Sequence, residues 1–493
     1  MKLSELFGTV DRKISQDVEI YGIKINSKDV VDGDLFVCTQ GANMDRHEFI
    51  NDAVSRGASA VVVSKKLEVD IPIVQVKDVN KVVDILFQKF YGFPQNALEM
   101  YAVTGTDGKT TTAWILQALL GNNYCGNIGT NGVIYSGHIE SSKNTTPDSD
   151  KVYAYLEKFK NHGLKASVME MSSEAIHYNR LQNLKFEVIG YTNVTSEHLN
   201  THKTVENYLQ AKITVFTKHL ADNSTAILNA DDNYCAVFTS KISEKFGKNV
   251  EIATYGKSNA CTLQILTSSI TSKGTDIVFK YAQKEYQILS PLFGDYNVYN
   301  LALALLMCIS GGHEIEKILE NIPKLHIPGR FELLDFGSSM PKLIVDFAHT
   351  PNAVKNILKF AKSNARAGIL YGGGKIITVI GQPGERDAIK RPEVGKILSK
   401  YSDYAILTAD DPRTESVLEI CAQIASGIST SCKYEIVEDR HAAIKRAVEI
   451  SNCNDIIMIL GKGAERRQKI MGVDVDYNDI DTVYKIFGKT KDQ

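Results

Sequence analysis

The sequence predicts an α/β protein whose sheets are mainly parallel and are covered by helices. Two observations support this fold class. Short apolar stretches rich in β-branched residues recur along the chain, and helical stretches separate them. These stretches are continuously apolar, which is typical of parallel strands buried on both faces. We expect strands at 58–64, 166–172, 186–194, 224–230, 342–348, 375–381, 404–410 and 455–461.

The length of the chain indicates several domains, because 493 residues exceed what one ordinary core supports. Two stretches with proline and glycine mark candidate seams, "YGFPQNALEM" just ahead of a strand and "PKLHIPGRFELL" ahead of a new strand–helix series. The sequence therefore predicts three domains, at 1–95, 96–328 and 329–493.

Composition excludes several classes of protein. A net charge of -2 argues against a basic surface for nucleic acid or anionic lipid. The longest apolar run, 301–309, suits a core helix and is too short to cross a bilayer. The first residues lack the apolar stretch of a signal peptide, and the eight cysteines form no C-x-x-C pair. We expect a cytoplasmic protein with reduced thiols and no membrane insertion.

The stretch "YAVTGTDGKTTTAWI" (101–115) is the strongest local signal of function. A strand, a glycine-rich turn and a helix surround an anion with backbone N–H groups and a helix N-terminus. The two glycines would let the backbone approach phosphates, the lysine would reach the β- and γ-phosphates, and a threonine would bind Mg²⁺. The alternative is a lysine in an ordinary turn, which the clustered glycines and threonines disfavour. The predicted ATP contacts here are Thr104, Gly105, Thr106, Asp107, Gly108, Lys109, Thr110 and Thr111.

This loop resembles that of the Mur ligases and their folylpolyglutamate synthetase relatives. The usual phosphate loop has a glycine where this chain has Val103, and the shorter spacing is a trait of that family. The resemblance implies a central P-loop-type ATPase domain and a Rossmann-like C-terminal domain. The family's other motifs recur in order at 26–58, 144–149, 169–180, 192–202, 207–216, 229–232, 294–305, 327–332, 345–354, 384–392, 410–415 and 461–468.

The resemblance implies an ATP-dependent amide ligase, and we expect a monomer, although the sequence does not determine the oligomeric state. ATP would phosphorylate a carboxylate to an acyl phosphate, and an amine would then displace phosphate. The N-terminal motif looks like the uridine-binding domain of the ligase that extends UDP-N-acetylmuramoyl-L-alanyl-D-glutamate by a diamino acid. The cofactors implied are ATP and Mg²⁺.

Four residues would surround the metal by resemblance: Thr110, Glu170, His198 and Lys212. The family carbamylates the lysine that matches Lys212, and CO₂ addition converts a cation into an anion able to approach Mg²⁺. Lys109 joins Glu170, His198 and Lys212 as catalytic. Without the resemblance, Glu170 would be read as a strand-end cap, His198 as a structural histidine and Lys212 as a solvated helix lysine.

The family grips its nucleotide with further residues from the second and third domains. Asn297 and Asn300 would contact ATP or brace the phosphate loop. Arg330 would suit developing phosphate charge, and Asp346 would suit ribose hydroxyls, with His349 beside them. Without the resemblance, their stretch would be read as a strand end and a turn.

The UDP-sugar-peptide site implied by the resemblance combines hydroxyls with an arginine, groups that suit diphosphate and carboxylates. Some positions depart from the family pattern, notably Asn26, Lys28, Glu174, Glu197 and Asn200. The predicted contacts are Ser27, Asn144, Thr145, Thr146, Ser172, Tyr178 and Arg180.

The incoming amine is the least determined part of the prediction. Arg386 would bind its α-carboxylate. Asp411 stands where ligases for meso-diaminopimelate usually have asparagine, and an anion suits a lone ammonium, so L-lysine is slightly favoured. Ala464 replaces the histidine that is usual in ligases for diaminopimelate, which also favours lysine. Arg413, however, could bind the extra carboxylate of diaminopimelate. Alternatively, Asp411 and Arg413 pair with each other and contact no substrate. The predicted contacts are Arg386, Asp410, Asp411, Pro412, Arg413, Gly461 and Glu465.

Two other functions remain open. The same chemistry on another acid, as in folylpolyglutamate synthetases, is disfavoured by the uridine-type N-terminal motif. A non-catalytic nucleotide-binding protein is disfavoured because both Lys109 and Lys212 are present.

Overall fold

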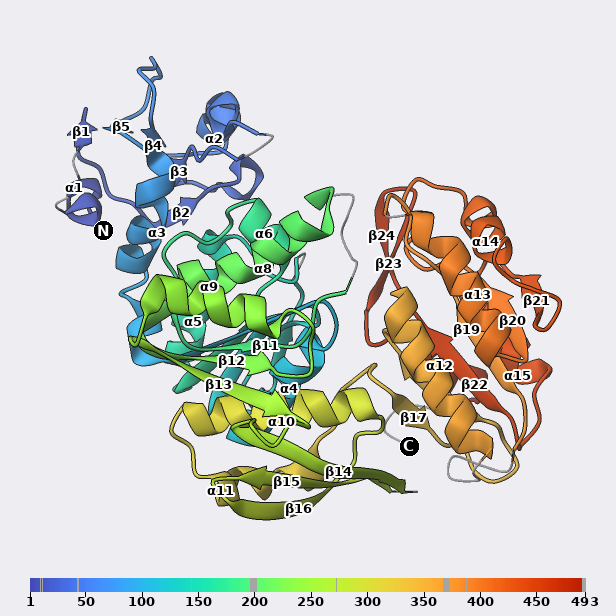
Figure 1. The fold of residues 1–493 in the computed structure, drawn as a ribbon. Coiled ribbons are helices and arrows are strands. Elements are labelled where there is room, and N and C mark those ends of the chain that lie inside the picture. Colours follow the sequence, from blue (N-terminus) through green and yellow to red (C-terminus); the bar gives the residue numbers. More distant parts are fainter. Residues whose placement is uncertain are drawn as a thin grey trace.

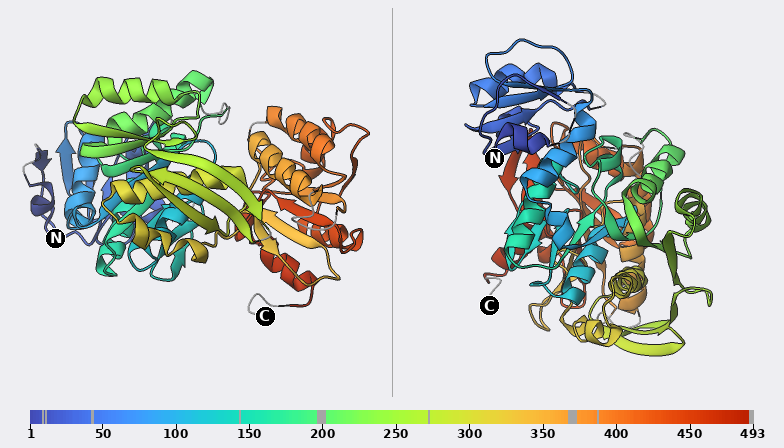
Figure 2. Two further views of the ribbon diagram at one scale, coloured as in Figure 1. Left: turned by 60° about the horizontal axis from the view of Figure 1, so that its bottom comes forward. Right: turned by 90° about the vertical axis from the view of Figure 1, so that its left-hand side faces the viewer.

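The computed structural model describes residues 1–8, 10, 12–41, 44–142, 144–195, 202–271, 273–366, 373–386 and 388–489. Three large sheets follow one another along the chain, and β23 (Arg467–Ile470) and β24 (Val473–Asp476) form a separate two-stranded antiparallel sheet (Figure 1). In the left view of Figure 2, the N-terminal unit with the first sheet (blue) and the C-terminal unit with the third sheet (orange to red) lie at opposite ends of the central unit, which carries the second sheet.

The first sheet has the strand order β1-β5-β4-β3-β2, in which β1 is antiparallel and the other neighbours are parallel. Its core continues into the central unit. Side chains of α1 (Leu3–Phe7) and α3 (Val79–Phe90) belong to the same buried cluster as those of α5 (Ser149–Asn161) and α8 (Val205–His219). The elements are α1 (Leu3–Phe7), β1 (Arg12–Ile14), β2 (Gly22–Lys24), η1 (Ser27–Asp29), β3 (Asp34–Val37), η2 (Arg46–Phe49), α2 (Ile50–Ser55), β4 (Ala60–Val63), β5 (Ile73–Val76), α3 (Val79–Phe90) and η3 (Pro94–Ala97).

The central sheet runs β16-β15-β14-β13-β12-β11-β6-β10-β7-β8-β9. Strands β14 to β7 in this order are parallel, and antiparallel hairpins extend both edges. Helices α4 and α10 pack in one core cluster, while α5, α8 and α9 pack in another. The strands are β6 (Glu99–Thr104), β7 (Cys125–Gly129), β8 (Gly132–Tyr135), β9 (His138–Glu140), β10 (Ala166–Glu170), β11 (Phe186–Tyr191), β12 (Leu220–Asn229), β13 (Val250–Gly256), β14 (Leu263–Thr271), β15 (Gly274–Tyr281) and β16 (Lys284–Ser290). The helices are α4 (Lys109–Leu120), α5 (Ser149–Asn161), α6 (Ser173–His177), α8 (Val205–His219), α9 (Cys235–Phe246), α10 (Asp295–Ser310), α11 (Ile315–Leu319) and η4 (Ile322–Lys324).

The third sheet has the order β17-β18-β22-β19-β20-β21, with β17 antiparallel and the rest parallel. Helices α12, α13 and α14 supply one core cluster, and α15 and α16 the other, so both faces are covered. The elements are β17 (Glu332–Leu334), β18 (Lys342–Asp346), α12 (Pro351–Arg366), β19 (Ile376–Ile380), η5 (Ala388–Lys390), α13 (Arg391–Tyr401), β20 (Tyr404–Leu407), α14 (Val417–Ala425), β21 (Lys433–Ile436), α15 (Arg440–Glu449), β22 (Ile456–Leu460), β23 (Arg467–Ile470), β24 (Val473–Asp476) and α16 (Asp479–Ile486).

The α/β prediction is confirmed. Each of the eight apolar stretches contains a strand with a parallel neighbour, and 301–309 lies inside the buried helix α10. The antiparallel hairpins at the edges of the central sheet are not among the predicted strands. All eight cysteines are free thiols, and among the described residues no helix is long and apolar enough to cross a bilayer. The domain limits near 95 and 328 stay a prediction.

Candidate active site

The phosphate loop joins the end of β6 to the start of α4, and its two glycines cannot be replaced without collision. Gly105 has φ +147°, and a Cβ there would lie 1.8 Å from Thr192 Oγ1. Gly108 has φ +87°, and a Cβ there would lie 2.3 Å from Asn300 Oδ1. Asn300 therefore packs against the turn, and its role as an ATP contact or as a brace of the loop stays a prediction.

The loop backbone is fixed by Asn193, which follows β11. Asn193 accepts a hydrogen bond from the Asp107 amide at 3.0 Å and donates to the Asp107 carbonyl at 3.1 Å. Its carbonyl accepts from the Thr106 amide at 2.8 Å. Lys109 Nζ bonds the carbonyls of Gly105 at 2.9 Å and Thr106 at 2.8 Å. Sequence reasoning missed Asn193, although its place directly after an apolar strand was a usable signal.

Glu170 ends β10 beside the loop, buried at 1% exposure. Its carboxylate accepts from Thr110 Oγ1 at 2.8 Å and from the amide and hydroxyl of Thr130 at 2.8 and 3.1 Å. A Cβ on Gly129 would lie 2.1 Å from Glu170 Oε1, so glycine at position 129 leaves the space that the Glu170 carboxylate occupies. Carboxylate and hydroxyl oxygens suit Mg²⁺, and these residues fit the predicted metal. His198 lies outside the described residues.

Lys212 is buried in α8, at 1% exposure, so it is not a solvated helix lysine. Its Nζ donates to the Gly105 carbonyl at 2.6 Å and lies 4.4 Å from the Tyr208 ring centroid. The Tyr208 hydroxyl in turn is 3.1 Å from Thr106 Oγ1. Helix α8 thus contacts the phosphate loop through two side chains. The carbamate role of Lys212 stays a prediction.

Arg330 and Asp346 lie together at the entry to the third sheet. The Arg330 guanidinium lies 4.3 Å from the Phe347 ring centroid. Burial lowers the pKa of Arg330, and the nearby Asp346 carboxylate opposes that shift. Both Asp346 oxygens accept backbone amides, from Phe331 at 2.6 Å and Ala348 at 2.7 Å. Asp346 therefore braces this turn, and its contact with ribose stays a prediction.

Most residues predicted for the UDP-sugar-peptide gather next to Glu170. Thr146 Oγ1 lies 3.1 Å from Ser172 Oγ, and Arg180 Nη1 donates to the Thr146 carbonyl at 3.0 Å. The Arg180 guanidinium is 5.6 Å from the Tyr178 ring centroid. Ser27 is separate, buried in η1 of the first sheet's unit.

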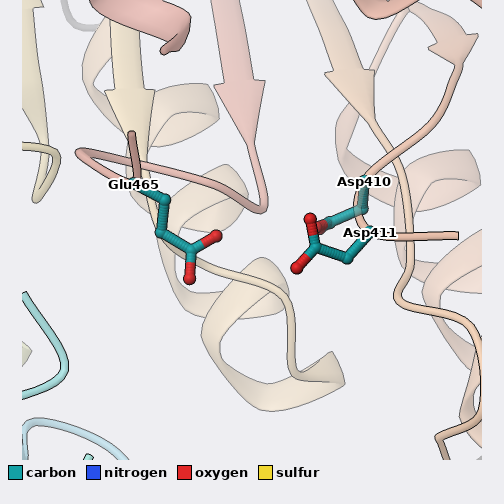
Figure 3. Close-up of side chains that lie close together, drawn as sticks. All are labelled: Asp410, Asp411 and Glu465. Carbon is teal, nitrogen blue, oxygen red and sulfur yellow. The ribbon is translucent and has the colours of Figure 1, made fainter. Parts of the chain in front are cut away.

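A cluster of charges follows β20 and β22 in the third sheet (Figure 3). Carboxylate oxygens of Asp410, Asp411 and Glu465 lie within 4.8 Å of one another. The buried Lys462 contacts all three, at 3.7, 2.8 and 2.9 Å. Burial would lower the pKa of Lys462, but the three carboxylates together raise it. With three carboxylates and one ammonium, this acidic cluster keeps a net negative charge.

The ion pairs of Asp411 and Arg413 differ from the pair with each other that the sequence left open. Asp411 binds the protein's own ammonium at Lys462, and Arg413 Nη1 lies 3.8 Å from Glu385 Oε2. A contact between Asp411 and a substrate ammonium stays a prediction. Sequence reasoning overlooked Lys462, whose place between two glycines after an apolar strand was a signal.

Three hydrogen bonds between described residues join the units of the central and third sheets beside the loop. Arg386 Nη1 bonds Glu174 Oε1 at 3.2 Å. Asp107 of the phosphate loop accepts from Thr350 Oγ1 at 3.3 Å and from Asn352 Nδ2 at 3.2 Å. The site is therefore built from both units.

A single cavity of about 700 Å³ contains most of these groups. Residues that were not among the predicted contacts also line it, including Thr130, Asn193, Thr350, Asn352 and Arg467. The predicted residues that line it are Thr106, Asp107, Gly108, Lys109, Thr110, Thr111, Asn144, Thr145, Glu170, Ser172, Arg180, Asn297, Asn300, Arg330, Asp346, His349, Arg386, Asp410, Asp411, Arg413, Gly461 and Glu465. The predicted residues outside its lining are Ser27, Thr104, Gly105, Thr146, Tyr178, Lys212 and Pro412.

A phosphate loop that faces a charged cluster across two α/β units defines an enzyme of the nucleotide-using class. Comparison with known families narrows that class. The model of the Mur ligase middle domain matches residues 103–308, that of the Mur ligase glutamate ligase domain matches 329–463, and that of the Mur ligase family catalytic domain matches 19–91. The chain belongs to the Mur ligase family.

Individual relatives are similar in sequence to this protein along nearly its whole length. The chain is 37% identical to the UDP-N-acetylmuramoyl-L-alanyl-D-glutamate--2,6-diaminopimelate ligase of Aquifex aeolicus, over 95% of this chain and 94% of that one. The protein of the same name from Bacillus cereus is 34% identical, over 94% and 93%. A solved structure with that name covers 99% of both chains at 27% identity, with a TM-score of 0.66. The MurF ligase of Thermotoga maritima in complex with ADP, at 19% identity, shares the fold with a TM-score of 0.64 over 94% of this chain and 96% of that one.

Proposed function

We propose that this enzyme is an ATP-dependent ligase that joins 2,6-diaminopimelate to the D-glutamate of UDP-N-acetylmuramoyl-L-alanyl-D-glutamate, in peptidoglycan precursor synthesis. The observation that carries the proposal is the shared cavity. It brings the phosphate loop, the Thr145–Arg180 region and the acidic cluster within one space. We place the reaction in the cytoplasm, where ATP is available.

The loop side of the cavity supports ATP and Mg²⁺. Backbone amides at the start of α4 and the Lys109 ammonium suit the triphosphate. Thr110 and Glu170 would hold the metal, which neutralises charge during phosphoryl transfer. The substrate carboxylate attacks the γ-phosphorus, ADP leaves, and an acyl phosphate forms. The amine then attacks the acyl carbon, and phosphate leaves.

The cationic side chains of the cavity favour diaminopimelate as the amine. Arg386, Arg413 and Arg467 all line it, and diaminopimelate offers two carboxylates to them, whereas lysine offers one. The names of the relatives agree with this choice. Lys462 already neutralises part of the Asp411 charge, which weakens the preference for lysine that Asp411 alone suggests.

L-Lysine is the second candidate, because the acidic cluster keeps a net negative charge beside the cavity. A distal ammonium without a carboxylate would find partners at Asp410 and Glu465. The same negative charge would also receive the ammonium of diaminopimelate's distal end.

The test is phosphate release with the UDP-dipeptide and a panel of amines, namely meso-diaminopimelate, L-lysine and L-ornithine. We expect the largest kcat/KM for meso-diaminopimelate and no release with Lys109→Ala. A larger kcat/KM for lysine than for meso-diaminopimelate would overturn the assignment of diaminopimelate as the amine. Release with a folate or another acid, but none with the UDP-dipeptide, would overturn the proposed substrate. ATP binding without turnover on any acid would indicate a non-catalytic protein.

A further inference from the structure

Asp107 is held by two different units of the protein. Asn193 of the central unit binds both its amide and its carbonyl. Its carboxylate points the other way, because Oδ1 accepts from Thr350 and Oδ2 from Asn352, at 3.3 and 3.2 Å. The backbone of this residue therefore belongs to the phosphate loop, while its side chain is bound by the third sheet's unit.

The partner of this carboxylate is the start of a long helix. Helix α12 spans 16 residues, and Thr350 immediately precedes it. Thr350 Oγ1 also accepts from the Ala353 amide at 3.1 Å, so it caps the first turn. A helix N-terminus carries partial positive charge and stabilises a nearby anion. Asp107 supplies that anion from another unit.

A carboxylate in a phosphate loop needs such a partner. An isolated aspartate there would repel the phosphates of a nucleotide. Hydrogen bonds to Thr350 and Asn352, together with the helix dipole, disperse its charge. Arg330 is also near enough for the Asp107 charge to oppose the lowering of its pKa by burial.

We propose that Asp107 is a positioning residue that docks α12 onto the phosphate loop. Its contact sets the distance between the nucleotide held by the loop and the acidic cluster of the third unit. The catalytic consequence rests on the proposed function, because it concerns the meeting of acyl phosphate and amine. The docking itself does not depend on which acid or amine is used.

The first test separates positioning from nucleotide binding. Asp107→Ala and Asn352→Ala should each lower kcat about tenfold, the range of one charge-assisted hydrogen bond. Affinity for ADP, measured by calorimetry, should change by less than about threefold, because the phosphates lose no donor. Lys359→Ala, an exposed position on the same helix, should leave kcat unchanged. A large loss of ADP affinity with unchanged kcat would overturn the positioning role.

The second test exchanges donor and acceptor. Asn352→Asp should lower kcat more than Asn352→Ala, since it sets two carboxylates against each other. Combining it with Asp107→Asn restores one amide and one carboxylate, so kcat should return to within about threefold of the unmutated enzyme. A double variant no better than either single variant would overturn the proposal, because loss of packing alone would not be rescued.

Small-angle scattering with ADP gives a readout without catalysis. Asn352→Asp should enlarge the radius of gyration, and the double variant should reverse this change. An identical radius in all variants would contradict docking even if the unmutated enzyme turns over the UDP-dipeptide normally. Failure of the unmutated enzyme on every amine, with the scattering change present, would instead overturn the proposed function alone.

Discussion

The phosphate loop and the acidic cluster line the same cavity, but different forces define them. The loop is defined by backbone: a Cβ at Gly105 or Gly108 would collide with side chains of the same unit, and Asn193 fixes the turn. The acidic cluster is defined by side-chain charge, with three carboxylates around the buried Lys462.

This difference predicts two kinds of response to substitution. Backbone amides and a steric fit bind phosphate whichever amine is used, so damage to the loop should remove activity altogether. Charges discriminate between amines that differ by one carboxylate, so changes in the cluster should alter preference more than rate. The predictions below test this contrast, from the largest expected effect to the smallest.

Lys212→Ala should lower kcat about 100- to 1000-fold, the loss typical of a preorganised polar group at a reacting centre. The reason is that Lys212 contacts Gly105 of the loop directly and, as a carbamate, would bind the metal. The measurement is phosphate release with the preferred amine.

Gln210→Ala, an exposed position of the same helix, is the control and should be unaffected. Partial recovery of a CO₂-depleted preparation of the unmutated enzyme by bicarbonate would support the carbamate. Near-normal turnover by Lys212→Ala would contradict the role.

Gly105→Ala should raise the KM for ATP at least tenfold and lower the melting temperature. The added Cβ meets Thr192 Oγ1, and overpacking of this kind costs about 1–3 kcal/mol. Gly163→Ala is the matched control: Gly163 also has a positive φ, but a Cβ there meets nothing within 4 Å. It should cost about 1 kcal/mol of unfolding free energy through strain alone, with no change in KM. Equal effects of the two variants would show that the loop is not sterically defined.

Asp411→Asn should change amine preference without abolishing activity. Removal of one negative charge weakens repulsion of a distal carboxylate, so the ratio of kcat/KM for diaminopimelate to that for lysine should rise about fivefold, equivalent to about 1 kcal/mol. Glu449→Gln, a half-exposed carboxylate of α15, serves as the control. An unchanged ratio would remove Asp411 from the determinants of amine preference.

Glu174→Gln should have the smallest effect. Glu174 binds Arg386, the residue predicted to take the amino acid's α-carboxylate, and so competes with it. A half-exposed ion pair contributes about 0–1 kcal/mol, so the KM for the amine should fall by less than about fivefold. The KM for ATP should stay constant. An increase in the amine KM would show that Glu174 helps to hold the substrate instead.

Local motifs in the sequence are enough to predict much of the candidate site. The loop from Thr104 to Thr111 is a continuous stretch, so its glycines and lysine are recognisable without knowledge of distant contacts. Glu170 and Asp410 each lie near the end of an apolar stretch, and strand ends of parallel sheets are where ligand-binding residues gather. The resemblance to a family then joins these separate motifs into one site.

Other features could not be predicted from residues that are close together in the sequence. The extension β14–β16 is not predicted, because its three strands are partly exposed and lack the continuous apolar signal of the buried parallel strands. The pairing of Lys462 with Asp411 joins residues 51 positions apart, and nothing local distinguishes that pair from Asp411 with Arg413.

The sequence by itself determined the α/β class, the phosphate loop and the order of the family's motifs, because each depends on residues within a few positions of one another. Tertiary structure decided which charges meet. Asp107 reaches Thr350 across 243 positions, and Glu174 reaches Arg386 across 212. Such contacts arise when separately folded units are brought together, and Coulomb energy depends on distance in space, which sequence spacing does not give.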